Sequence, residues 1–171
     1  MKEYKNIKYY ITDDYPCKGV KFIDFTPSLL DYQNIEKIID ELVELVKEDV
    51  DYIVVPDARG FIWGMGVANK LKVGLIPVRK TGKLPKENIQ NSINYKTEYS
   101  TTSLDLPIVD LNQKKCLFVD DVYATGGTYK AVKEMVEKSG GIVTQAIVLY
   151  NVLIENNKEI YYLYDKNDLI K

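Results

Sequence analysis

Two adjacent carboxylates, Asp120 and Asp121, follow an apolar run in the second half of the chain. The run, residues 115–119, predicts a buried strand, so the pair stands at the carboxyl end of that strand. There the two side chains suit the vicinal hydroxyls of a ribose, because a carboxylate accepts hydrogen bonds and a charged hydrogen bond contributes about 1.5–3 kcal/mol. We therefore expect Asp120 and Asp121 to bind a sugar.

A turn with two consecutive glycines, Gly126 and Gly127, comes shortly after the carboxylates. The glycines allow the backbone to bend and to approach a ligand, and the helix predicted next presents amide N–H groups that have no partner inside the helix. These amides and the helix dipole favour a phosphate, to which the hydroxyls of Thr125 and Thr128 add donors. The pattern is neither a P-loop nor a dinucleotide-binding fingerprint. The alternative, a solvated strand end with a Gly-Gly turn, leaves most of the pattern unexplained.

Strands and helices alternate around this segment. Apolar runs predict buried strands, and apolar side chains at helical spacing predict helices between them. This alternation implies an α/β fold with a mainly parallel sheet flanked by helices, whose ligands gather at the carboxyl ends of the strands. The predicted strands are residues 52–55, 73–78, 115–119 and 142–150, and the predicted helices are residues 35–46 with Asn34 as N-cap, 61–71, and one between Thr128 and Ser139.

Two stretches do not fit this alternation. Residues 79–114 lack sustained periodicity, and an irregular stretch of that length inside a compact domain is usually a functional lid or disorder. The C-terminal residues 155–171 have no assigned role, but they contain an apolar run, residues 160–164, that is compatible with an edge strand.

The totals limit the kinds of protein that this chain can be. A length of 171 residues suits one domain, and 46% hydrophobic with 28% charged residues is typical of soluble globular proteins. A net charge of −2 argues against nucleic acid as a partner, because such an interface needs clustered Lys and Arg. Residues 1–10 lack the apolar core of a signal peptide and no apolar stretch is long enough for a membrane span, so we expect a cytoplasmic protein.

The chain has no histidine, which excludes a Ser-His-Asp triad, a Cys-His dyad and a His-ligated metal. Any acid or base must therefore be a carboxylate, Lys, Tyr or Cys. The two cysteines, Cys17 and Cys116, are too few and too far apart to suggest a disulfide framework or a metal cluster. Cys116 opens a strand-like run, and we expect it in the core.

The thirteen residues from Cys116 to Thr128 resemble the signature with which type I phosphoribosyltransferases bind phosphoribosyl pyrophosphate (PRPP). The resemblance to the adenine phosphoribosyltransferases of this family covers about residues 15–150 and includes residues 57–64 and 78–85. In the family the first of these segments grips pyrophosphate after a peptide bond that is often cis, here Asp57–Ala58, and the second precedes a mobile hood loop. The resemblance implies that PRPP is bound by Asp120, Asp121, Ala124, Thr125, Gly126, Gly127 and Thr128, and its pyrophosphate by Ala58, Arg59, Gly60, Arg79, Lys80 and Lys83.

Residues 15–27 resemble the segment that binds the purine in this family, where backbone groups read the edge of the base and an aromatic ring packs on its face. The matching positions are Val20, Lys21 and Phe22. Ile23 departs from the family pattern, which generally has Arg or Lys there. We expect the backbone, which this replacement leaves intact, to set the preference for adenine.

The resemblance also implies a reaction: one domain over residues 1–171 transfers the phosphoribosyl group of PRPP to adenine, forming AMP and pyrophosphate in purine salvage. Arg59 is implied to be catalytic, together with Glu98, whose segment 95–100 resembles the loop where a glutamate acts as acid or base at the purine N7, although the family usually has glycine where Ser100 stands. Mg²⁺ is implied to be carried by PRPP without a protein ligand of its own, the hood loop, residues 79–103, to exclude water, and the protein to be a homodimer. The alternatives are another purine substrate (hypoxanthine, guanine or xanthine) and a PRPP-sensing regulator without catalysis.

Overall fold

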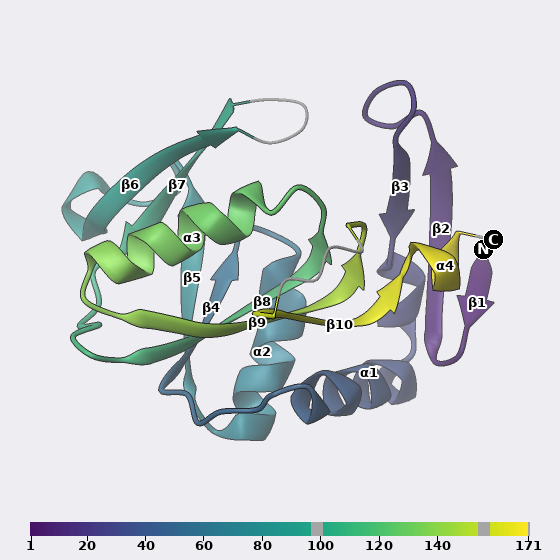
Figure 1. Ribbon diagram of the computed structural model, residues 1–171, viewed down its shortest axis with the longest axis horizontal. Helices are drawn as coiled ribbons and strands as arrows, with labels where there is room; N and C mark the ends of the chain where they lie inside the picture. Colours follow the sequence, from purple (N-terminus) through teal and green to yellow (C-terminus); the bar gives the residue numbers. More distant parts are fainter. Residues whose placement is uncertain (97–100, 154–157, 171) are drawn as a thin grey trace.

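The computed structural model describes residues 1–96, 101–153 and 158–170. Within these residues, one sheet has seven strands in the order β10-β9-β8-β4-β5-β7-β6 (Figure 1). Strands β10, β9, β8, β4 and β5 run parallel to one another, β7 pairs antiparallel with β5, and β6 pairs antiparallel with β7. The strand bounds are β4 Tyr52–Pro56, β5 Gly74–Lys80, β6 Ile89–Lys96, β7 Thr101–Pro107, β8 Lys115–Tyr123, β9 Ile142–Asn151 and β10 Ile160–Asp165.

Helices cover both faces of this sheet: α1 (Tyr32–Glu44) and α2 (Gly60–Leu71) on one face, and α3 (Gly127–Lys138) on the other. The central strand β8 shows why, because its successive side chains point to opposite faces. Leu117 and Val119 belong to the core under α1 and α2, whereas Cys116 and Phe118 pack in the core under α3. The predicted α/β class with a mainly parallel sheet is confirmed, and Cys116 is buried as expected.

A small antiparallel sheet, β1 (Lys2–Tyr4), β2 (Ile7–Asp13) and β3 (Lys21–Asp24), stands beyond the β10 edge of the large sheet (Figure 1). The 3-10 helix η1 (Thr26–Leu30) connects this N-terminal sheet to α1. The Tyr9 hydroxyl donates to the carbonyl oxygen of Leu169 in α4 (Lys166–Leu169) at 3.0 Å, and Phe25 packs near the ring of Tyr150 on β9. The first 25 residues are therefore joined to the main core.

Several sequence-based boundaries need correction. Helix α1 begins at Tyr32, and its N-cap is Asp31, whose carboxylate accepts from the Gln33 amide at 3.0 Å; the prediction of Asn34 was wrong because the helix starts a turn earlier. Strand β8 continues to Tyr123, so the two carboxylates lie within the strand and their side chains alternate between its faces. The edge strand expected near residues 160–164 is confirmed as β10.

The largest correction concerns residues 79–114, which were expected to be irregular. They contain the strands β6 and β7, paired as a hairpin, with the short 3-10 helix η2 (Lys86–Asn88) before them. The sequence hides these strands because their outer face is polar. Their inner face carries only a few apolar side chains, which pack in the core under α3, namely Ile93, Tyr95, Leu104 and Leu106.

Candidate active site

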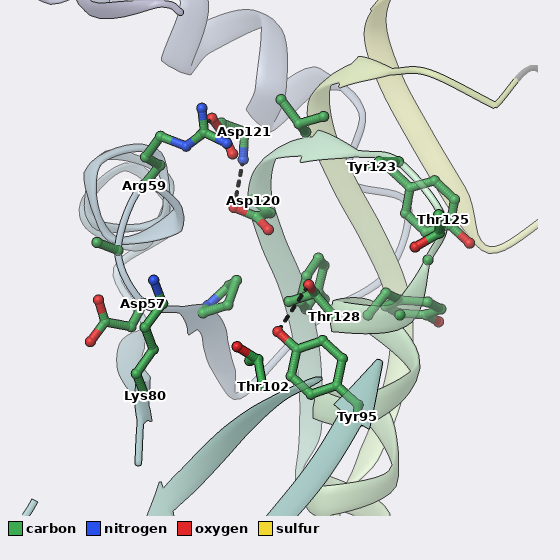
Figure 2. Close-up of a pocket in the computed structure, with 18 residues that line it drawn as sticks. Asp57, Arg59, Lys80, Tyr95, Thr102, Asp120, Asp121, Tyr123, Thr125 and Thr128 are labelled. Atoms are coloured by element: carbon green, nitrogen blue, oxygen red, sulfur yellow. Dashed lines mark hydrogen bonds and ion pairs between the residues drawn. The ribbon is translucent and has the colours of Figure 1, made fainter. Parts of the chain in front are cut away.

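A cavity of about 500 Å³ opens at the carboxyl ends of the central strands, where ligands of parallel α/β sheets bind (Figure 2). Four segments distant in sequence meet there: the β4–α2 loop, the end of β5, the β6–β7 hairpin and the β8–α3 connection. Their lining residues are Pro56, Asp57, Ala58, Arg59, Lys80, Tyr95, Thr102, Phe118, Asp120, Asp121, Val122, Tyr123, Ala124, Thr125, Gly126, Gly127, Thr128 and Tyr129.

The turn before α3, residues 124–128, forms one wall, which we call the phosphate cradle. Gly126 is the N-cap of α3 with φ of +77°, a left-handed conformation that favours glycine, and a Cβ there would lie 2.4 Å from the Tyr123 hydroxyl oxygen. The helix begins its hydrogen bonding with the Lys130 amide, which donates to the Gly126 carbonyl at 2.9 Å, and no side chain caps the helix. The amides of its first turn are thus available to an anion at the cavity.

The hairpin touches the cradle through Tyr95, whose hydroxyl lies 3.2 Å from the hydroxyl oxygen of Thr128. Burial raises the pKa of Tyr95, so its phenol stays protonated near neutral pH and able to donate. Sequence reasoning gave no site role to Tyr95, Thr102 or Tyr123, all of which line the cavity. For Tyr123 the signal was its place between the carboxylates and the glycines. No local signal marked Tyr95 and Thr102, because the hairpin that carries them reaches the cavity through the pairing of β7 with β5.

The carboxylate pair lies between the two walls of the cavity. The Asp121 side chain is 5% exposed, and its Oδ2 pairs with Arg59 Nε at 2.9 Å, while its backbone amide donates to Asp120 Oδ1 at 2.8 Å (Figure 2). Burial raises the pKa of both carboxyl groups; the charge of Asp121 raises that of Asp120 further, and Arg59 opposes the rise at Asp121. Two acids held out of water in this way are suited to accept hydrogen bonds from the hydroxyls of a bound sugar.

The loop between β4 and α2 forms the opposite wall. The peptide bond between Asp57 and Ala58 is cis, as the resemblance implied. A Cβ on Gly60 would lie 3.0 Å from the Val119 carbonyl oxygen and 3.1 Å from Asp120 Oδ1, so this glycine lets α2 start directly against β8. The positive ends of two helices, α2 and α3, therefore flank one cavity, as a ligand with phosphates at both ends would require.

The three basic residues expected on β5 and after it take different places. Lys80 lines the cavity, whereas Lys83 is exposed and is not among the lining residues. The Arg79 side chain pairs with Asp57, with 3.0 Å between Nε and Oδ2, and its guanidinium lies 5.7 Å from the centre of the Phe61 ring. Arg79 thus supports the loop between β4 and α2 and is not among the residues that line the cavity.

Two of the predicted base-binding residues, Lys21 and Phe22, lie on β3, and the third, Val20, immediately precedes that strand. The guanidinium of Arg59 lies 5.2 Å from the centre of the Phe22 ring, which links this segment to the carboxylate pair. Val20 is half-buried, and Lys21 is exposed and paired with Asp13. Ile23 is 3% exposed and faces the core, so the departure from the family pattern falls on a packed position. The predicted catalytic Glu98 lies outside the described residues.

Comparisons with known proteins agree with this arrangement. Residues 26–168 match the family model described as the phosphoribosyl transferase domain. The adenine phosphoribosyltransferase of Thermosipho africanus is 43% identical over 166 residues, 95% of each chain. The crystal structure of adenine phosphoribosyltransferase from Thermoanaerobacter pseudethanolicus superposes with a TM-score of 0.84 at 37% identity, covering 92% of this chain and 95% of that one.

A third relative was crystallised with ligands. The adenine phosphoribosyltransferase of Saccharomyces cerevisiae, complexed with an imino-altritol bisphosphate and adenine, has a TM-score of 0.77 at 29% identity, covering 91% of this chain and 94% of that one. The similarity to these relatives in sequence and fold extends along nearly the whole chain. The chain therefore belongs to the phosphoribosyltransferase family and, within it, to the adenine phosphoribosyltransferases.

Proposed function

We propose that the protein transfers the phosphoribosyl group of PRPP to adenine, releasing pyrophosphate and forming AMP. The observation that carries this proposal is the joining of the buried carboxylate pair, Asp120 and Asp121, with the first turns of α2 and α3 around one cavity. A ribose with a phosphate on one side and a pyrophosphate on the other requires these three features. The relatives of this chain are named adenine phosphoribosyltransferases, and the Saccharomyces cerevisiae relative was crystallised with adenine.

In the reaction, N9 of adenine forms a bond to C1 of the ribose while the bond from C1 to the pyrophosphate oxygen breaks, and the bonding electrons leave with pyrophosphate. Arg59 and Lys80, both at the cavity, would stabilise the departing charge, which is the main contribution expected of a preorganised site. For N9 to attack with its lone pair, adenine must carry its ring proton on N7, and Glu98 would accept that proton as the bond to C1 forms. Exclusion of water protects the electrophilic ribose from hydrolysis.

Mg²⁺ is the expected cofactor, and the residues present fit a cation that arrives with its substrate. Among the described residues no group of three His, Cys, Asp or Glu side chains could hold a metal by itself. Mg²⁺ in phosphoryl-substrate sites keeps several waters and is held largely by phosphate oxygens, so it would arrive on PRPP, while Asp120 and Asp121 accept from the ribose hydroxyls. When bound, Mg²⁺ would neutralise charge on the pyrophosphate.

The test is to incubate the purified protein with PRPP, Mg²⁺ and each purine in turn and to measure the nucleotide formed. Adenine should be used with kcat/KM about a hundredfold or more above hypoxanthine, guanine and xanthine. The two kinds of purine present opposite donors and acceptors at the same edge, and the wrong one leaves buried polar groups unpaired. Comparable rates with a 6-oxopurine would withdraw the adenine assignment, and PRPP binding without any product would favour a regulator.

A homodimer and a cytoplasmic location complete the proposal. Helix α2 exposes two large apolar side chains three residues apart, Ile62 at 45% and Met65 at 58%, which share one side of the helix and suit a subunit interface. Sedimentation should give a dimer, and Met65→Lys should shift it toward the monomer.

Cys17 is exposed with a free thiol, as is usual in a reducing compartment. None of the described helices is long and apolar enough to cross a membrane.

A further inference from the structure

Asp105 on β7 has no exposed surface, although a carboxylate is costly to bury unless it is well paired. Its Oδ1 accepts hydrogen bonds from the hydroxyls of Thr81, at 2.9 Å, and Ser92, at 2.7 Å. Its Oδ2 accepts from the backbone amide of Gly82 at 3.3 Å. Two of these three donors are consecutive residues of one turn, which lies directly after β5.

That turn joins two basic residues. The Lys83 amide donates to the Lys80 carbonyl at 3.2 Å, which closes a four-residue turn, and Gly82 has φ of +85°, the positive value that type II turns need at their third residue. The Thr81 amide also donates to the carbonyl of Ser103 on β7 at 3.0 Å. Lys80, the first residue of the turn, lines the cavity. Asp105 therefore binds both central residues of a turn that presents a lysine to the substrate site.

We propose that Asp105 is a positioning residue for pyrophosphate, acting through Lys80. Its carboxylate fixes the backbone from which the long lysine side chain reaches the cavity. This matters because a flexible cation binds an anion weakly unless its starting point is held, and small misplacements of a charged group reduce binding and rate. The identity of the anion rests on the proposed function, whereas the link from Asp105 to Lys80 rests on the distances above.

The experiment measures the Kd of pyrophosphate in the presence of Mg²⁺ by calorimetry, and the KM values for PRPP and adenine by initial rates. Asp105→Asn keeps the shape of the side chain but removes its charge and one acceptor. It should raise the Kd of pyrophosphate and the KM of PRPP about tenfold, the scale of one charged hydrogen bond, and leave the KM of adenine within about twofold. Asp110→Asn is the matched control, because Asp110 is an exposed carboxylate that accepts from the Asn112 amide at 3.1 Å. It should change none of these values.

A double substitution separates positioning from a general effect on the fold. In a Lys80→Ala background, Asp105→Asn should change the Kd of pyrophosphate only within about twofold, because the group through which it acts is gone. The same tenfold loss in both backgrounds would overturn the proposal.

If Asp105→Asn does not fold, as judged by circular dichroism, two smaller changes keep the proposal open to test. Thr81→Val, which removes a bond to the turn, should weaken pyrophosphate binding about threefold or more, and Ser92→Ala, which removes a bond to the hairpin, should not. The reverse order would overturn it. If the variants change the Kd of pyrophosphate as expected but the wild-type protein forms no AMP, the proposed function is contradicted and the role of Asp105 stays supported.

Discussion

The phosphate cradle and the base-binding segment, residues 20–22, belong to one predicted site but are built in different ways. The cradle is continuous in sequence with strand β8, and the groups that we expect to bind phosphate are backbone amides whose direction is set by the start of α3. The predicted base-binding segment belongs to the small N-terminal sheet, and the contact between Phe22 and Arg59 links it to the carboxylates. A site made by one segment can be recognised from its sequence, whereas a site made by several requires the fold.

This difference suggests that the two halves of the site can be altered separately. The strand that carries the cradle is buried between two layers of helices, so changes there should alter the binding of PRPP. The tip of the N-terminal sheet, residues 14–19, is exposed. Substitutions in the adjoining residues 20–22 should therefore alter the binding of adenine without lowering the stability of the core.

The strongest test of the PRPP half is Asp121→Asn. The change removes a charged acceptor for the ribose and the partner of Arg59, and a charged hydrogen bond is worth about 1.5–3 kcal/mol, so kcat/KM for PRPP should fall about a hundredfold. The KM for adenine should change little. Asp13→Asn is the control, because Asp13 also pairs with a cation, Lys21, but in an exposed pair that contributes little. Unchanged affinity for PRPP would show that the carboxylate pair does not bind the ribose.

Glu98→Gln tests a residue assigned by resemblance alone. The amide cannot take up the purine proton, so kcat should fall about tenfold or more, while the Kd of PRPP and the melting temperature stay unchanged. Glu87→Gln, an exposed glutamate in η2, provides the matched control. Wild-type turnover in Glu98→Gln would place the acid or base elsewhere and leave the PRPP half of the comparison intact.

Phe22→Leu tests the base half. The substitution keeps an apolar side chain but removes the ring that faces Arg59 and packs against Tyr15, with 5.2 Å between the centres of the two rings. The KM for adenine should therefore rise about threefold to tenfold, as loss of an aromatic contact implies. The KM for PRPP should stay within about twofold, because Arg59 keeps its ion pair with Asp121. Tyr10→Leu, an exposed aromatic position in the same small sheet, should have no effect on either value. Equal losses for both substrates would show that the two halves are not separable.

The sequence predicted the part of the fold that depends on local patterns. Parallel strands buried on both faces read as continuous apolar runs, which is why β4, β5, β8 and β9 were found, and the helices between them have one apolar face. The hairpin β6–β7 was missed because a strand with one polar face and few apolar residues gives little signal in a short window. Its position depends on pairing with β5 and packing on α3, which are long-range contacts.

The candidate site divides in the same way. The carboxylates and the cradle were predicted from one motif, and all of these residues line the cavity. Arg79 was predicted to bind pyrophosphate, and its partner, Asp57, can be identified only from the structure because 22 residues separate the two. Tyr95 lines the cavity for a similar reason: its contact with Thr128 joins residues 33 positions apart. Such contacts depend on the topology of the sheet and not on the spacing of residues along the chain.

The raised pKa of Asp120 predicts a small effect of this carboxylate on stability. Burial, and then the charge of Asp121, raise the pKa of Asp120 well above the value of 3.8 that describes the unfolded chain. The folded protein therefore holds this proton more tightly than the unfolded chain. Between pH 3.8 and the raised folded pKa, Asp120 lowers the free energy of unfolding as the pH increases.

Asp120→Asn removes that penalty while its oxygen can still accept from the Asp121 amide. The variant should melt a few degrees above wild type at pH 7, because a shift of one pKa unit corresponds to about 1.4 kcal/mol and each 1 kcal/mol moves the melting temperature by about 2–4 °C in a protein of this size. The advantage should shrink as the pH falls and Asp120 takes up its proton in the wild type.

Asp51→Asn should behave in the opposite way, because the Lys115 amide lowers the pKa of that exposed carboxyl and the wild type loses this stabilisation in acid. Differential scanning calorimetry of the three proteins from pH 2 to pH 8 measures both trends, because the Asp51 effect disappears only as the pH falls below 3.8. An Asp120→Asn variant that is less stable than wild type at pH 7 would mean that the Asp120 carboxylate stabilises the fold in the absence of ligand.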